Sequence, residues 1–166
     1  MKYLIIILIL IISNCVRAEE FFPLDINYAA KSVEECYGIT VLHEIRGTVF
    51  RFELKNPKAE YHALSLDVYS KIKCIEYFLA KIKNPVIIEV HTNKVPEGMN
   101  IRNWEFSSVI AGKIEDAFLC GVPKISSDRI YSVGYGEFMP DINTSNNGGK
   151  SSGRVDIIIL SSISGE

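Results

Sequence analysis

The chain has 166 residues, 48% of them hydrophobic, which suits a single domain with a substantial core. Its formal net charge is −2, so it lacks the basic surplus that is typical of nucleic-acid-binding proteins. The three histidines, His43, His62 and His91, are scattered along the chain without the paired spacing of metal ligands. We therefore expect no nucleic-acid partner, no metal and no cofactor.

Residues 1–18 have the pattern of a secretory signal peptide. Lys2 supplies the positive start, Leu4 to Ile12 is an unbroken apolar run, and Val16-Arg17-Ala18 resembles a cleavage site. A membrane-spanning helix needs about 17–25 apolar residues, and this run is much shorter. The pattern predicts export and cleavage, with an uncleaved anchor as the alternative.

The cysteines leave two questions open. Lipoprotein signals also end in a cysteine, so lipidation of Cys15 would tether the product to a membrane, although Asn14 is larger than the usual residue before it. In an oxidising compartment, Cys36, Cys74 and Cys120 allow one disulfide and one spare thiol. We expect Cys74–Cys120 because both fall on predicted helices. The alternative is three buried, reduced cysteines.

A lead-in covers residues 19–47 and contains a short helix, Tyr28 to Tyr37, and a strand, Ile39 to Ile45. A second strand, Thr48 to Leu54, follows Arg46-Gly47, which indicates a hairpin. Asn56-Pro57 then breaks the pattern.

Two amphipathic helices dominate the rest of the chain. The first runs from Ser65 to Ile82, and the second runs to Cys120 from Asn103, the expected N-cap. The second helix is predicted to bury Phe106, Ile110, Ile114, Ala117 and Phe118. Strands are predicted at Val86 to His91, Arg129 to Val133 and Val155 to Leu160. The pattern predicts an α+β fold, a βαβαββ sandwich with two main helices packed on a mixed sheet, over residues 48–160, with 161–166 as a tail.

Four segments between residues 86 and 160 resemble, in order and spacing, the OmpA-like domain of OmpA, Pal and MotB proteins. They are His91-Thr-Asn93, Asn103-Trp-Glu-Phe-Ser-Ser108, Gly134-Tyr-Gly-Glu137 with Pro140, and Gly153-Arg-Val155. The resemblance covers about half of the chain clearly and about two thirds loosely. It implies a periplasmic envelope module that holds the diaminopimelate of peptidoglycan.

The resemblance also implies a site, but one without most of its charges. In the family, an Asp meets the ligand ammonium and an Arg on the next helix meets its carboxylate. Asn93 and Ile110 stand at these two positions, and Gly153 replaces the first of two closing arginines. The candidate peptidoglycan-binding residues are Thr92, Asn93, Asn103, Ile110 and Arg154.

The sequence leaves two functions open. The first is a non-enzymatic scaffold or anchor subunit of an envelope-spanning assembly such as a secretion system, with peptidoglycan affinity weak or lost and protein partners in the envelope. The second is a functional peptidoglycan-binding anchor, a Pal-like lipoprotein with altered contacts, attached to the outer membrane if Cys15 is lipidated. An enzyme is not expected, since the sequence shows no activated nucleophile and no carboxylate pair at telling spacing.

Overall fold

The computed structural model describes residues 32, 33, 35–139 and 153–161. The predicted signal peptide, Cys15, half of the predicted helix from Tyr28 to Tyr37, and residues 162–166 of the predicted tail lie outside this part of the chain. Among the residues described, no helix combines the length and the apolar character needed to cross a membrane.

A mixed sheet of five strands forms the centre of the fold, in the order β1-β2-β5-β3-β4. Neighbouring strands are antiparallel except for β3 and β4, which are parallel and are joined through helix α5. The strands are β1 (Thr40–Glu44), β2 (Gly47–Glu53), β3 (Val86–Thr92), β4 (Ile130–Gly136) and β5 (Gly153–Leu160). The predicted α+β class and mixed sheet are confirmed.

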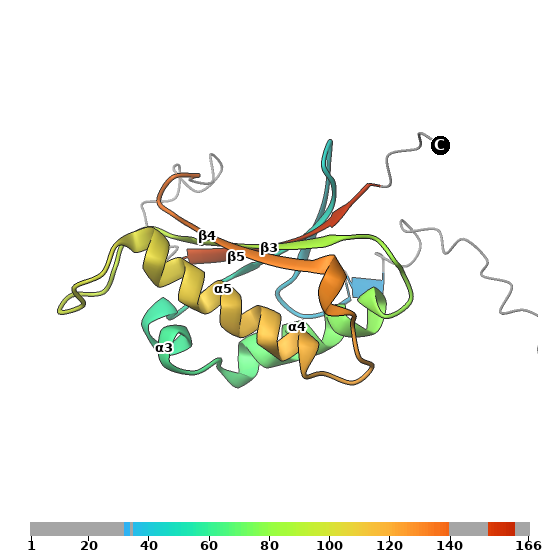
Figure 1. The fold of residues 1–166 in the computed structure, drawn as a ribbon, viewed down its shortest axis with the longest axis horizontal. Helices are drawn as coiled ribbons and strands as arrows, with labels where there is room; N and C mark the ends of the chain where they lie inside the picture. Colours follow the sequence, from blue (N-terminus) through green and yellow to red (C-terminus); the bar gives the residue numbers. More distant parts are fainter. Residues whose placement is uncertain (1–31, 34, 140–152, 162–166) are drawn as a thin grey trace, which may run out of the picture.

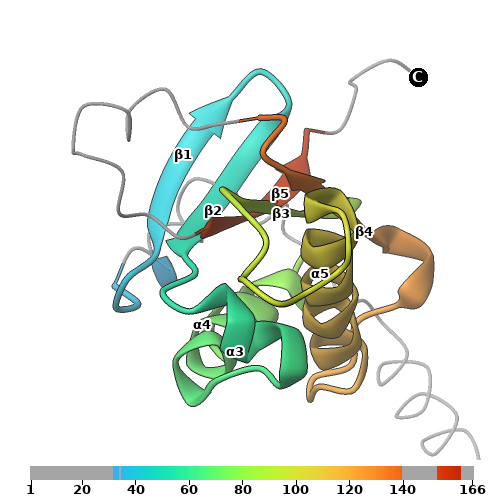
Figure 2. The same cartoon turned by 90° about the vertical axis from the view of Figure 1, so that its left-hand side faces the viewer.

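The helices α3 (Pro57–His62), α4 (Leu66–Leu79) and α5 (Asn103–Leu119) lie together on one side of the sheet (Figures 1 and 2). A short 3-10 turn, Ser127–Arg129, precedes β4. From β2 to β5 the order is the predicted βαβαββ with α3 added, and β1 extends the sheet into the predicted lead-in.

Local chemistry explains where the helices begin. Ser65 Oγ accepts a hydrogen bond from the Val68 amide, 3.3 Å away, and caps α4. Helix α3 is absent from the sequence prediction, because Asn56-Pro57 looks like a break. In the structure Asn56 is its N-cap and Pro57 its first residue, a position where proline needs no hydrogen bond.

The start of α5 differs from the prediction by one residue. Arg102 is the N-cap, and its amide donates to Glu105 Oε2 at 2.9 Å, as in a capping box. Asn103 is therefore the first residue of the helix rather than its cap, which leaves its side chain available for other contacts.

The core lies between the helices and the sheet. Alternate residues of β3 and β5 point towards the helices and meet their apolar faces. Its largest fully buried side chains include Phe50, Phe52, Ile72, Ile75, Ile88, Phe106, Ile110, Ile114 and Phe118. The predicted buried face of the second helix is confirmed at Phe106, Ile110, Ile114 and Phe118, and Ala117 is partly buried.

The disulfide joins Cys36 to Cys74, with their Cα atoms 6.6 Å apart, and so ties the segment before β1 to α4. The predicted pair Cys74–Cys120 is wrong, and so is the alternative of three buried, reduced cysteines. Cys74 packs beside Cys36 against the core, whereas Cys120 follows the last residue of α5 and is exposed as a free thiol. Placement on two helices does not bring two Cα atoms within bridging distance.

Candidate functional site

The end of β3 is hydrogen-bonded to the start of α5. Thr92 Oγ1 donates to Asn103 Oδ1 at 2.6 Å, and Asn103 Nδ2 donates to the Thr92 carbonyl at 2.8 Å. The same Nδ2 also donates to Glu137 Oε2, 2.5 Å away, just beyond β4. Two of the predicted site residues, Thr92 and Asn103, are therefore in contact. Asn103 also contacts the carboxylate of Glu137, which is not predicted as a site residue from the sequence.

The two glycines of Gly134-Tyr-Gly136 let α5 approach β4. A Cβ on Gly134 would lie 2.1 Å from the Ser108 amide nitrogen, and Gly136 has φ of +53°. Ser107, fully buried, accepts a hydrogen bond from the Gly136 amide at 2.9 Å and donates to the Trp104 carbonyl at 3.0 Å. This close packing fixes the first turns of α5, and with them Asn103, against the sheet.

The other predicted site residues have different environments. Asn93 directly follows β3 and is exposed. Ile110 is 0% exposed within the core, so its side chain does not reach the surface in this structure. The helical spacing that places Ile110 on the buried face of α5 also explains why it cannot line the site.

Arg154 lies opposite His91 in the β3–β5 pairing. Its Nε donates to Asp156 Oδ2 at 3.1 Å, and another of its nitrogens donates to the Met139 carbonyl at 2.8 Å. The one closing arginine that the chain retains is thus already engaged by its own chain. Gly153, beside it, packs so closely that a Cβ would lie 2.7 Å from the His91 carbonyl oxygen.

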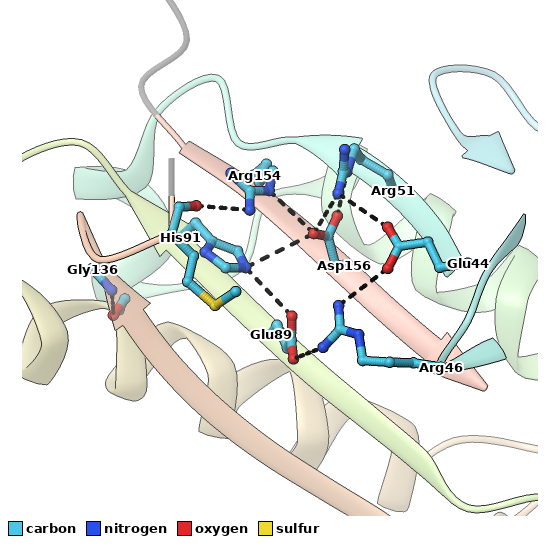
Figure 3. Close-up of polar contacts among 10 residues, drawn as sticks. Glu44, Arg46, Arg51, Glu89, His91, Gly136, Arg154 and Asp156 are labelled. Atoms are coloured by element: carbon cyan, nitrogen blue, oxygen red, sulfur yellow. Dashed lines mark hydrogen bonds and ion pairs between the residues drawn. The ribbon is translucent and has the colours of Figure 1, made fainter. Parts of the chain in front are cut away.

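A group of charged residues occupies the sheet face opposite the helices (Figure 3). This sheet-face cluster consists of Glu44, Arg46, Arg51, Glu89, His91, Arg154 and Asp156. Its members reach the same face because Glu89 pairs with Asp156 and His91 with Arg154 across β3 and β5, and Arg51 of β2 pairs with Asp156.

Arginines hold both buried carboxylates of the cluster. Arg51 donates two hydrogen bonds to Asp156, of 2.6 and 2.9 Å. Arg46, in the turn between β1 and β2, donates a hydrogen bond of 2.7 Å to Glu89 Oε1. Burial opposes ionisation of Asp156, but Arg51 and Arg154 outweigh it and hold its pKa below the ordinary value. Burial likewise opposes ionisation of Glu89, and nearby His91 and Arg46 hold its pKa below the ordinary value.

His91 is the unusual member of the cluster. Its ring stacks on Tyr135, with the centroids 5.2 Å apart, and it is 4% exposed, yet neither ring nitrogen has a hydrogen-bond partner among the residues that the structure describes. Its Nε2 lies 3.7 Å from Glu89 Oε2 and 3.8 Å from Asp156 Oδ2. Among the described residues, these three side chains are a group that could hold a metal ion.

The spacing of the histidines gives no sign of this trio, because two of its members are carboxylates. A different signal is present in the sequence, since Glu89, His91 and Asp156 interrupt strands that are otherwise almost entirely apolar. The pairing between β3 and β5 cannot be read from the local pattern.

No protein-family model and no curated protein matches this sequence. Several solved structures are similar. An outer membrane protein from Borrelia burgdorferi B31 is 25% identical, with 75% of this chain and 98% of that chain covered and a TM-score of 0.56. The cell wall anchor of the T6SS from Pseudomonas aeruginosa is 15% identical, with 81% of this chain and 96% of that chain covered and a TM-score of 0.57. The OmpA-like domain of FopA1 from Francisella tularensis is 14% identical, with 75% and 83% covered and a TM-score of 0.51.

Proposed function

We propose, from the OmpA-like fold that this chain has, that it is a non-enzymatic scaffold or anchor subunit of the cell envelope. Similar structures include a cell wall anchor and an outer membrane protein, which supports a role of this general kind. The predicted signal peptide would deliver the product to the periplasm, and lipidation of Cys15 would add attachment to the outer membrane.

In this proposal the peptidoglycan site is degenerate, and the observation that carries this is the burial of Ile110. The resemblance requires a cation at this position, and here the position belongs to the core. Asn93 cannot supply the anion, and Arg154 is bound to Asp156 and Met139. Loss of one partner from a desolvated charge pair costs about 2–5 kcal/mol, which weakens binding about thirty-fold or more.

Partners in an envelope-spanning assembly are then expected to be proteins. The test is sedimentation of the purified chain with insoluble peptidoglycan, followed by measurement of the bound fraction. The chain should stay in the supernatant, and Asn93→Asp alone should restore little binding, because the cationic position remains apolar. Strong sedimentation of the unmodified chain would contradict the degenerate site.

A functional peptidoglycan-binding anchor with altered contacts is the second candidate, and the Asn103–Glu137 contact favours it. Glu137 is exposed and places a carboxylate beside Asn103, where it would replace the missing Asp as partner of an ammonium group. If the chain sediments, Glu137→Gln should release it. Glu97→Gln is the matched control, since Glu97 is an exposed acid on the loop between β3 and α5.

A further inference from the structure

We propose that Glu89 Oε2, His91 Nε2 and Asp156 Oδ2 form a binding site for a first-row transition-metal dication of the Zn²⁺ type. The three groups lie on the sheet face opposite the helices, and the proposal does not depend on the contacts of Asn103, although Arg154, a candidate peptidoglycan-binding residue, belongs to the same cluster.

The buried imidazole is the first argument for this site. Both nitrogens of His91 are buried without a hydrogen-bond partner among the described residues, and an unpaired buried polar atom destabilises the folded chain. The position of the ring is fixed by its stacking on Tyr135, and Nε2 points between two carboxylates. A cation at this point would give Nε2 the partner it lacks.

The distances are the second argument. Ligand atoms around a tetrahedral ion with bonds of about 2.0–2.1 Å lie about 3.4 Å apart. Nε2 is 3.7 and 3.8 Å from the two carboxylate oxygens, and all three ligand atoms lie within 4.8 Å of one another. Small side-chain rotations would bring them to bonding distance. One imidazole and two carboxylates favour Zn²⁺ or Co²⁺ over Mg²⁺ and Ca²⁺, which prefer oxygen ligands alone.

Arginine side chains orient both carboxylates. Arg46 binds Oε1 of Glu89 and leaves Oε2 facing His91, while Arg51 holds Asp156 through Oδ1 and Oδ2, and Arg154 donates to the same Oδ2 at 3.1 Å. Both carboxylates are thereby fixed in orientation and kept ionised.

The arginines also set the energetic cost of binding. The cluster contains three carboxylates, of Glu44, Glu89 and Asp156, and three guanidinium groups, so it is neutral when His91 is neutral. A dication would leave an uncompensated positive charge unless an arginine withdraws. Arg46 is the one able to do so, because its side chain is 44% exposed in a turn, whereas those of Arg51 and Arg154 are 22% and 15% exposed. Arg46 and the metal therefore compete for Glu89.

This competition gives a sharp test. Purified full chain with ¹⁵N-labelled histidine would be titrated with Zn²⁺ at constant neutral pH, and the imidazole resonances followed. The Nε2 resonance of His91 should shift at one equivalent, while exposed His43 and His62 remain unchanged. Glu89→Gln should abolish the shift. Arg46→Gln should tighten binding by about tenfold or more, because it removes a nearby positive charge. His62→Gln is the control and should change nothing.

Three results would overturn the proposal. The first is a His91 resonance that stays unchanged at tenfold excess Zn²⁺, and the second is a parallel shift of all three histidines, which indicates adventitious binding. The third is weaker Zn²⁺ binding by the Arg46→Gln variant than by the unmodified chain, when the two have the same melting temperature. If Glu89→Gln fails to fold, as judged by circular dichroism, the unmodified chain and Arg46→Gln still decide the question.

Discussion

Asn103 Nδ2 lies 2.5 Å from Glu137 Oε2, and this contact joins the first residue of α5 to the segment that follows β4. Together with the two hydrogen bonds between Asn103 and Thr92, it holds three segments of the chain at one point. This point corresponds to the end of the domain where the resemblance places the ligand. The polar groups of Thr92, Asn103 and Glu137 stabilise the fold at this point.

Asn103→Ala should therefore destabilise the protein. The change removes three hydrogen bonds and leaves Thr92, which is nearly fully buried, with an unpaired hydroxyl, at a cost of about 1–3 kcal/mol in the free energy of unfolding. Urea denaturation would measure the loss. Asn100→Ala, an exposed residue in the preceding loop, should change stability by less than about 0.5 kcal/mol.

Ile110→Arg introduces the side chain that the resemblance predicts at this position, yet it should destabilise the protein rather than restore binding. The guanidinium would replace a core side chain with 0% exposure, at a cost of about 3–5 kcal/mol. Thermal unfolding would measure it. Val109→Arg adds the same charge at the adjacent residue, which is 40% exposed, and should leave the melting temperature nearly unchanged. Equal effects of the two changes would contradict the packing described for α5.

Cys74→Ser should lower the free energy of unfolding by about 2–4 kcal/mol, because the Cys36–Cys74 bond closes a loop with a sequence separation of 38. Cys120→Ser should be neutral, since Cys120 is an exposed free thiol. Adding dithiothreitol to the unmodified chain should lower its free energy of unfolding as Cys74→Ser does. An equal loss of stability in Cys74→Ser and Cys120→Ser would instead support the Cys74–Cys120 pair that the sequence suggested.

Gly134→Ala and Gly112→Ala should act in opposite directions. A Cβ on Gly134 would lie 2.1 Å from a backbone nitrogen of α5, so the helix would have to move away from β4. Gly112 lies within α5, and no atom of the described residues outside its own helix backbone lies within 4 Å of the position of its Cβ. Alanine there should stabilise the protein by about 0.5–1 kcal/mol. The two melting temperatures, each compared with that of the unmodified chain, test this difference.

Acid should weaken the protein partly through Asp67. Its hydrogen bond with Lys71, 2.5 Å long, holds the pKa of Asp67 below the ordinary value of 3.8. A carboxyl group whose pKa is lowered on folding stabilises the folded state above its unfolded pKa, and this contribution disappears as the pH falls through the folded pKa. Asp67→Asn should therefore flatten the decline of melting temperature below about pH 4. Asp116→Asn, which changes an exposed acid of α5, is the control.

The periodic parts of the fold could be predicted from the sequence. Helix α4 and strands β2, β3 and β5 follow from repeated apolar side chains, because burial on one face imposes the period. Helix α3 has only six residues, too few for a period to show. For Ile110 the sequence supports two incompatible predictions: helical spacing predicts a buried position, and the resemblance predicts a ligand contact. In the structure Ile110 is buried.

The disulfide and the sheet-face cluster depend on which segments meet in space. Cys36 lies before β1 and reaches α4 only when the chain has folded. In the same way, Glu89 and Asp156 are far apart in the sequence and become neighbours because β3 pairs with β5. Such contacts are not encoded in local spacing, although charged residues within apolar strands do indicate that some partner must exist.

The strand order has a consequence for how the protein is made. β5 is the last strand in the chain, yet it lies between β2 and β3 in the sheet. While residues up to β4 leave the ribosome, β2 and β3 have no strand to join them, and the sheet cannot close until residue 160 has been synthesised. The complete five-stranded sheet of this topology therefore forms only after its last described strand has been synthesised.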